Sequence, residues 1–585
     1  MADDRGESRP FNLTEAFLFP KLFRGFRIAI DYRKLLLALI AIGLFYGVGV
    51  LTDWVGGLFR GPDVVAVGGV DELDAFTDEV KRGGVPAGMA AILPAAPQTA
   101  PTFEKWRDDA EKNRVEKLAG LLAGNPNAPG ALAERRDLAE KDINRAIGFL
   151  RAKIWDDYNN AAKAVDENQQ LDGDAKAKAK IALAKTRESA LADVDLKDGK
   201  GVFEAFLGFQ INRFNKAVHG LAFLPGSGGW EGTWLAVKDM AQAFVWLGKY
   251  HWVYAIILGI AWLVLASVFG GAIARLAAVQ AARDEKISAP EALKFSIRKF
   301  VSFISAPLIP FLIVAVVFVL TMCPAALAGV PFVGEIFVAV LSPLALIMGF
   351  IMALVVVGGV GGLGLMHPTI AVEGSDAFDA ISRGFSYVYS RPWRSILYNG
   401  CAIVYGGLCF LFVKLFVFLM LWLTWSVMGA LVWGGPAAVG ADGGDKIAAM
   451  WAQPGINDLH TVRWHLLQGW EVLGAIGLTI WVGVVVSLLV AFVVSYVYSS
   501  QTLIYLLLRK RVDATDLDDV YIEETEEEEL FEAPPEEGEE GKADKVERGP
   551  APDEGEAPDA IGAEAPPDEG GEGQDEGGDE GDKDE

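Results

Sequence analysis

The chain has 585 residues, 52% of them hydrophobic, and a formal net charge of -25 at pH 7. Most of that charge lies at the C-terminal end, where residues 513–585 hold 32 acidic and 4 basic residues, and the rest of the chain is close to neutral. The 3 cysteines are odd in number and lack metal-ligand spacing, so a disulfide framework is excluded, and no nucleic-acid partner is expected.

An apolar run near the N-terminus is predicted to be a membrane span. Residues 35–51 are almost entirely apolar and follow a segment rich in Lys and Arg. A hydrocarbon layer needs about 20 apolar residues per helical crossing, and basic residues collect on the cytoplasmic side. Residues 1–34 are therefore predicted to be a cytoplasmic basic, amphipathic N-terminus and residues 35–52 the first span. Acidic residues at the start of the chain disfavour a cleavable signal peptide, so this span is predicted to be a retained signal anchor.

The next region, residues 53–250, is predicted to be a mainly helical extracytoplasmic domain. Ala, Lys, Glu, Asp, Arg and Leu dominate residues 101–198, and apolar residues recur there at helical spacing. This pattern predicts amphipathic helices packed as antiparallel, coiled-coil-like hairpins, with breaks near residues 125–130 and 170–174. A few short strands are expected within residues 64–96. An apolar stripe in residues 202–225 is interpreted as a core face, with a helix lying on the bilayer surface as the alternative.

Five further apolar runs predict a helical bundle over residues 251–508. They cover about residues 253–274, 301–322, 336–363, 396–433 and 472–508. Counting each run once puts every cluster of Lys and Arg, and both chain termini, on the cytoplasmic side. The fourth run is longer than one crossing needs. Counting it twice, which is the alternative, would move the basic segment after the last run to the outside.

The predicted fold class is all-α, a polytopic helical membrane protein with about six transmembrane helices in the bacterial inner (cytoplasmic) membrane. The lipid bilayer is its expected environment, because only helices or closed barrels satisfy their backbone groups there. Residues 509–585 are predicted to be a cytoplasmic, disordered acidic tail. Their Glu, Asp, Gly and Pro cannot bury enough apolar surface to offset chain entropy.

An internal repeat precedes two of the outward crossings. Residues 291–307 and 376–392 align without gaps. Their shared positions include Arg298 and Arg383, Phe300 and Phe385, and Pro307 and Pro392. An amphipathic helix at the headgroups would place such an Arg near lipid phosphate and such a Phe at the acyl boundary, with Pro at the turn into the membrane. The repeat predicts two related units, each an amphipathic helix followed by a span.

This repeat, and above all the segment AISRGFSYVYSRPWRSILY, resembles polytopic bacterial membrane proteins of the planctomycete type. It also resembles the membrane domain attached to some glycerophosphodiester phosphodiesterases. The resemblance covers at most residues 287–508. It implies a membrane family and no reaction, because the His-Arg-Gly motif of the phosphodiesterase is missing.

A glycine-rich stretch lies in the run at 336–363. Gly359, Gly361 and Gly364 spell GxGxxG, but the run before them is too long for a strand and a proline follows where a helix should continue. Close helix packing through Gly358 and Gly362, or a hinge that includes Gly364, is the preferred interpretation.

Lys414 is the one basic residue well inside an apolar run, which makes it the leading candidate for an intramembrane polar site. It could pair with Glu335 or line a polar path, and snorkelling or an interior hydrogen bond is the alternative. Asp458, His460 and His465 could gather a metal, but ordinary loop polarity is preferred because i and i+5 share a helix face poorly. No catalytic, cofactor-binding or metal site is predicted.

The leading functional hypothesis is a non-enzymatic integral membrane protein that organises or regulates an envelope assembly. Other proteins are the expected partners of the extracytoplasmic helical domain and the acidic tail. The alternative is a transporter or channel subunit that moves a small solute or ion through the helix bundle, and an enzyme ranks third. The oligomeric state is left open.

Overall fold

The computed structural model describes residues 19–60, 66–67, 70–83, 103–123, 143–170, 172–195, 201–327, 333–428, 446–464, 467 and 470–521. Within these ranges the regular secondary structure is helical except for one pair of short strands, β1 (Ala66–Val67) and β2 (Val70–Asp71), which are antiparallel with Ala66 opposite Asp71. These strands lie within residues 64–96, where the sequence predicts a few short strands.

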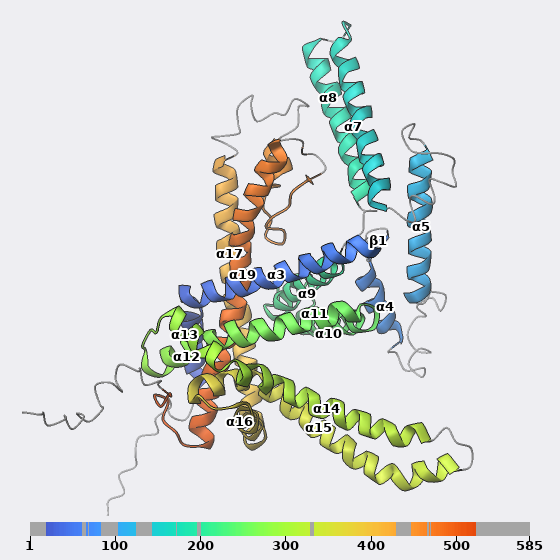
Figure 1. The fold of residues 1–585 in the computed structure, drawn as a ribbon. Helices are drawn as coiled ribbons and strands as arrows, with labels where there is room; N and C mark the ends of the chain where they lie inside the picture. Colours follow the sequence, from blue (N-terminus) through green and yellow to red (C-terminus); the bar gives the residue numbers. More distant parts are fainter. Residues whose placement is uncertain are drawn as a thin grey trace, which may run out of the picture. The chain divides into compact units, whose positions relative to one another are not determined.

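Six segments of the described chain are long and apolar enough to cross a membrane, which confirms the all-α, polytopic fold class. The spans are Tyr32–Gly56, Trp252–Arg283, Phe300–Met322, Ala339–Glu373, Pro392–Val427 and Trp470–Val512. They lie in α3 (Tyr32–Arg60), in α11 (Trp252–Leu265), η2 (Ala266–Gly270) and α12 (Gly271–Arg283), and in α14 (Phe300–Leu327), α15 (Val333–Glu373), α17 (Pro392–Val427) and α19 (Trp470–Val512). Figure 1 shows α14 beside α15, and α17 beside α19, as their contacts require.

Shorter helices connect and flank the spans. They are η1 (Phe19–Phe23), α2 (Arg24–Ala29), α4 (Glu72–Gly83), α5 (Phe103–Ala123), α7 (Ile143–Glu167), α8 (Gly173–Asp195), α9 (Val202–Leu221), α10 (Gly229–Tyr250), α13 (Ala289–Arg298), α16 (Ala377–Ser390) and α18 (Lys446–Met450). The start of α13 is fixed by a capping box, in which Ser288 and Glu291 satisfy each other's backbone N–H groups. Asp376 caps α16 by accepting from the backbone of Asp379.

The fourth apolar run forms a single helix. Helix α17 continues without a break from Pro392 to Val427, so the described part of this run is a single candidate span. Residues 429–433 of the predicted run lie outside the described residues.

Helices α5, α7 and α8 form a helical module with its own packing. Helices α5 and α7 share a core that includes Leu118, Leu122 and Ile147, all at most 1% exposed. Helices α7 and α8 pack as a hairpin, with the guanidinium of Arg187 4.4 Å from the ring centre of Trp155. The amphipathic spacing predicted such helices. The predicted break near residues 125–130 lies outside the described residues.

The cytoplasmic ends assigned by the sequence meet in one packed region, here called the junction. It is made of α2, α12, the C-terminal parts of α15 and α19, α16, the start of α17 and residues 513–521. Its core includes Leu365, Val372, Tyr387 and Ile504, each at most 1% exposed. The junction is apolar inside because each contributing helix turns its apolar side inward, and burial of that surface is its main stabilising term.

The predicted start of the disordered tail, residue 509, is wrong. Helix α19 runs to Val512, and residues 513–521 are packed on the junction. The backbone N–H of Tyr521 donates to the carbonyl of Val372 at 2.8 Å, and Val520 is 5% exposed. The acidic composition of residues 513–585 conceals these few apolar side chains. Residues 522–585 lie outside the described residues.

The two repeat units differ in a way that their sequences do not show. Pro392 is the first residue of α17, as predicted, but Pro307 lies inside α14, which begins at Phe300. The turn in the first unit therefore comes at Lys299, where α13 has ended. A proline interrupts a helix less when other helices or side chains satisfy the carbonyl it leaves free, so its position alone does not mark a boundary.

Candidate functional site

The glycine-rich stretch of α15 packs against α16 and α19. A Cβ atom at Gly358 would lie 2.9 Å from the ring of Phe385, and one at Gly362 would lie 3.3 Å from the backbone of Gly384. A Cβ at Gly364 would lie 2.6 Å from the amide of Gln501 in α19. These glycines let α16 and α19 approach the α15 backbone closely.

Helix α16 therefore packs on α15, and contact of its repeat residues with lipid headgroups stays a prediction. Phe385 covers the glycines of α15, and Arg383 forms ion pairs with the carboxylates of Glu373 and Asp379. In the first unit, Arg298 is exposed and Phe300 is half-buried. Carboxylates that the fold brings close to Arg383 compete with lipid phosphate for its guanidinium. The local sequence does not reveal these carboxylates.

A charged network holds the junction together, with Glu373 at its centre. The Arg383 Nε lies 2.9 Å from one carboxylate oxygen of Glu373, and the Arg509 Nε lies 3.1 Å from the other. The Tyr505 hydroxyl donates to the same carboxylate at 2.5 Å. Since the side chain of Glu373 is 10% exposed, this carboxylate is nearly enclosed by two guanidinium groups and one hydroxyl. Ion pairs and charge-assisted hydrogen bonds of this kind fix helix positions well.

The network extends to the first residue after α19. Asp513 accepts a hydrogen bond from the Tyr387 hydroxyl and lies 3.7 Å from Arg383. Burial, together with Asp513, raises the pKa of Tyr387 to about 12, so its hydroxyl stays protonated and acts as a donor. Arg509 also donates to the carboxylate of Asp519 at 3.0 Å.

Three backbone carbonyls complete the attachment of residues 513–521. The buried guanidinium of Arg275 in α12 donates to the carbonyls of Ala371 at 2.8 Å and Tyr521 at 2.7 Å. Lys299 donates to the carbonyl of Gly374 at 2.6 Å. Gly374 has φ +64, and the ring of Tyr521 fills the space where a Cβ would stand. The segment is thus held by α12, α15 and α19 together.

Lys414 lies in a second polar contact, here called the hairpin contact, between α9 and α17. It comprises Asn215, Val218 and Leu221 of α9 with Gly407 and Lys414 of α17. Lys414 is 4% exposed, and its Nζ donates to the Asn215 side-chain oxygen at 2.9 Å. An interior hydrogen bond, one of the sequence-based alternatives, is therefore the observed state. The side chain of Glu335 lies outside the described part of the chain.

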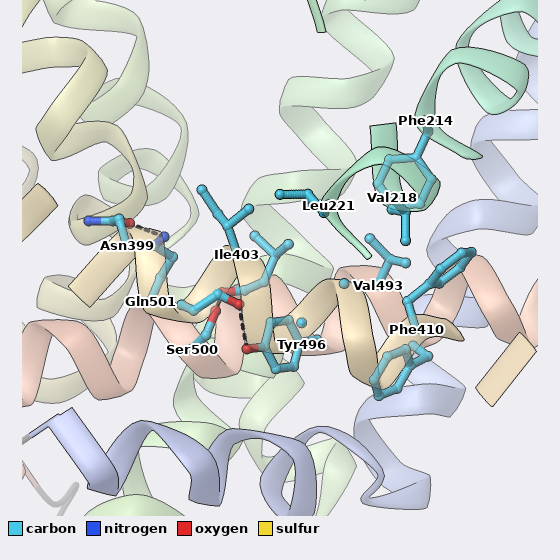
Figure 2. A pocket seen from close by; sticks show the side chains of 15 residues that line it. Phe214, Val218, Leu221, Asn399, Ile403, Phe410, Val493, Tyr496, Ser500 and Gln501 are labelled. Carbon is cyan, nitrogen blue, oxygen red and sulfur yellow. Dashed lines mark hydrogen bonds between the residues drawn. The ribbon is translucent and has the colours of Figure 1, made fainter. Parts of the chain in front are cut away.

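A cavity of about 210 Å³ adjoins the hairpin contact (Figure 2). Phe214, Val218 and Leu221 of α9 line one side, and residues of α17 and α19 line the rest. Its polar groups are already paired. Gln501 donates to Asn399 at 2.9 Å, and the Tyr496 hydroxyl donates to the carbonyl of Ala402 at 2.8 Å. The remaining surface is apolar, which favours hydrocarbon over a hydrated ion.

The loop that holds Asp458, His460 and His465, the alternative metal site of the sequence analysis, is only partly described. His465 lies outside the described residues, and Asp458 accepts a hydrogen bond from the Thr461 hydroxyl at 2.7 Å. Burial lowers the pKa of His460, although Asp458 opposes the shift. Among the described residues, no group of three or more His, Cys, Asp or Glu side chains could hold a metal ion.

Several residues of these two sites were missed by sequence reasoning. Glu373, Arg509 and Tyr505 lie at the ends of apolar runs, where charged and aromatic residues are common and carry no signal of pairing. Asn215 lies in a helix separated from Lys414 by 199 positions. Only the absence of an acidic partner within the same run could have suggested that Lys414 needs a ligand from elsewhere.

In comparisons with known proteins, no family model, curated protein or solved structure matches this chain. The resemblance of the repeat to planctomycete-type membrane proteins and to the phosphodiesterase-attached domain therefore stays a prediction.

Proposed function

We propose that this protein is a non-enzymatic integral membrane protein that organises or regulates an envelope assembly. One partner set would bind the helical module of α5, α7 and α8, and another the acidic residues that follow Tyr521. The proposal places both termini on the cytoplasmic side of the inner membrane. Lys and Arg gather beside the span ends that this orientation puts in the cytoplasm.

The observation that carries the proposal is the attachment of residues 513–521 to the junction. Arg275, Arg509 and Val372 hold this segment from α12, α19 and α15. A protein bound to the residues beyond it would therefore be held at the ends of three membrane spans. This arrangement suits a protein that anchors an assembly of other proteins to the membrane.

The helical module supplies the second support. Its two longest helices, α7 and α8, have 25 and 23 residues and form a hairpin whose outer surface is rich in Lys, Asp and Glu. Long polar hairpins offer a large, stable surface for another protein without needing a cavity.

The experiment is crosslinking in cells followed by affinity purification of three forms of the full protein. The first is unchanged, the second lacks residues 522–585, and the third keeps their length but has Gln and Asn in place of their Glu and Asp. We expect one set of crosslinked proteins to be lost from both altered forms while a second set remains. Recovery of the same proteins from all three forms, or of none from the unchanged form, would contradict the proposal.

A transporter or channel subunit is the second candidate, favoured by the burial of Lys414 within a span. In proteoliposomes this function predicts solute flux that disappears with Lys414→Leu while the unfolding midpoint stays close to that of the unchanged protein. Equal flux in both forms would remove this candidate.

A further inference from the structure

Both ends of the α9–α10 hairpin lie beside the same end of the α3 span. The carboxylate of Asp53, close to the end of that span at Gly56, accepts from the backbone N–H groups of Phe203 at 3.0 Å and Glu204 at 3.1 Å. Where the chain leaves α10, the Tyr254 hydroxyl donates to the carbonyl of Thr52 at 3.5 Å. The hairpin therefore starts and finishes at one level of the membrane.

The tip of the hairpin lies at a different depth. Asn215 binds Lys414, which stands about 33 Å along α17 from Pro392 and about 20 Å from Val427, at roughly 1.5 Å per residue. A Cβ at Gly407 would lie 3.6 Å from Leu221. These contacts place the C-terminal half of α9 beside the interior of a membrane span.

Contacts with α3 agree with this depth. The ring of Phe203 lies 5.9 Å from that of Phe45 near the start of α9. Near the end of α9, Val218 belongs to a buried cluster that also holds Ala29, the last residue of α2. Helix α9 thus packs against α3. Its 20 residues extend about 30 Å, which is the thickness of a hydrocarbon layer.

One charge pair of the hairpin is enclosed between its two helices. Arg213 lies 3.3 Å from the carboxylate of Asp239, which is 3% exposed, so this charge pair is enclosed between α9 and α10. Asn212 and Lys216 line a polar cavity of about 290 Å³ together with Asp74 of α4. The polar side of the hairpin thus faces α4.

The opposite side exposes large apolar residues. Trp230 is 65% exposed, Trp234 66%, Phe244 62% and, at the turn, Phe223 72%. Lys238 is exposed among these residues, but apolar exposure of this extent still marks a surface that another apolar phase covers. The neighbouring spans α3 and α17 also expose their apolar side chains, so the surface continues theirs.

We infer that α9–α10 is a re-entrant membrane hairpin, which enters and leaves at the Asp53 end of α3 and whose apolar side is covered by lipid hydrocarbon. Residues 202–250 then belong to the membrane region and not to the extracytoplasmic domain in which their polarity placed them. The hairpin escapes hydropathy searches because Arg213, Lys216 and Asp239 lower its mean hydropathy, although Arg213 and Asp239 are enclosed between its two helices.

The test uses nitroxide spin labels on the full-length protein in phosphatidylcholine vesicles. The parent carries Cys323→Ala, Cys401→Ala and Cys409→Ala, and single cysteines replace Trp230, Trp234 or Phe244. Collision of each label with oxygen is compared with collision with a water-soluble nickel chelate. Two reference labels are placed at Phe318, exposed in the α14 span, and at Asn160, exposed in α7.

We expect the three hairpin labels to favour oxygen severalfold relative to Asn160, as Phe318 does, and Trp230 to be deeper than Phe244. Each variant must keep the unfolding midpoint of the parent, and Val245→Cys replaces any that does not. Preference for the nickel chelate at the hairpin positions would overturn the inference. So would poor access to both reagents, which would mean a protein partner, or equal depth for Trp230 and Phe244, which would mean a helix lying along the surface.

Discussion

The junction and the hairpin contact both bury basic side chains, but they satisfy them in opposite ways. In the junction, Arg509 meets the carboxylates of Glu373 and Asp519, and Arg383 shares Glu373. In the hairpin contact, Lys414 meets one neutral amide, that of Asn215. A complete network of opposite charges stabilises the fold strongly, and the loss of one member costs much free energy of unfolding. A single hydrogen bond to a neutral group adds less stability, and its loss costs less.

The largest expected effect is the loss of the central carboxylate of the junction. Glu373→Gln removes the buried carboxylate that Arg383 and Arg509 share and leaves them more exposed carboxylates such as those of Asp379 and Asp519, so we expect a loss of about 3 to 5 kcal/mol of unfolding free energy. The measurement is denaturant or thermal unfolding in detergent, followed by intrinsic fluorescence. Glu285→Gln, which changes an exposed carboxylate, is the matched control and should have almost no effect. Equal stability of both variants would mean that the network does not hold the junction.

The next effect concerns the approach of α16 to α15. Gly358→Ala puts a Cβ 2.9 Å from the ring of Phe385, so we expect a loss of about 1 to 3 kcal/mol from overpacking. Gly359→Ala is the matched control, because a Cβ there has nothing within 4 Å. It should be neutral or slightly stabilising. A larger loss from Gly359→Ala would refute the packing described for this face.

A smaller effect is expected at the hairpin contact. Asn215→Leu leaves Lys414 buried without its acceptor, at a cost of about 1 to 2 kcal/mol. The double variant with Lys414→Leu should recover part of this loss, because neither side then buries an unpaired polar group. A double-mutant cycle from unfolding curves measures the coupling. Strict additivity would show that the two side chains do not interact.

The smallest expected effect is at the entrance of the hairpin. Asp53→Ala removes the acceptor for the first N–H groups of α9, so we expect a loss of about 0.5 to 1 kcal/mol, as for other helix caps. Asp53→Asn keeps an acceptor oxygen and should lose less. Unfolding midpoints that fall equally for both substitutions would assign the effect to the charge and not to capping.

The membrane spans could be predicted from the sequence because crossing a hydrocarbon layer depends on the average apolarity of about 20 consecutive residues. The amphipathic helices of the module followed equally from local spacing, as the burial of Leu118 and Ile147 illustrates. Both properties are local, so a folded neighbour is not needed to recognise them.

Tertiary structure decided the partners of the polar groups. It paired Lys414 with Asn215, brought Arg509 and Arg383 to Glu373, and attached residues 513–521 to α12 and α15. It also placed α9 along α3, although its composition resembles that of a soluble helix. A polar side chain near hydrocarbon takes whichever partner the fold brings within about 3 Å, and that choice depends on segments far apart in the chain.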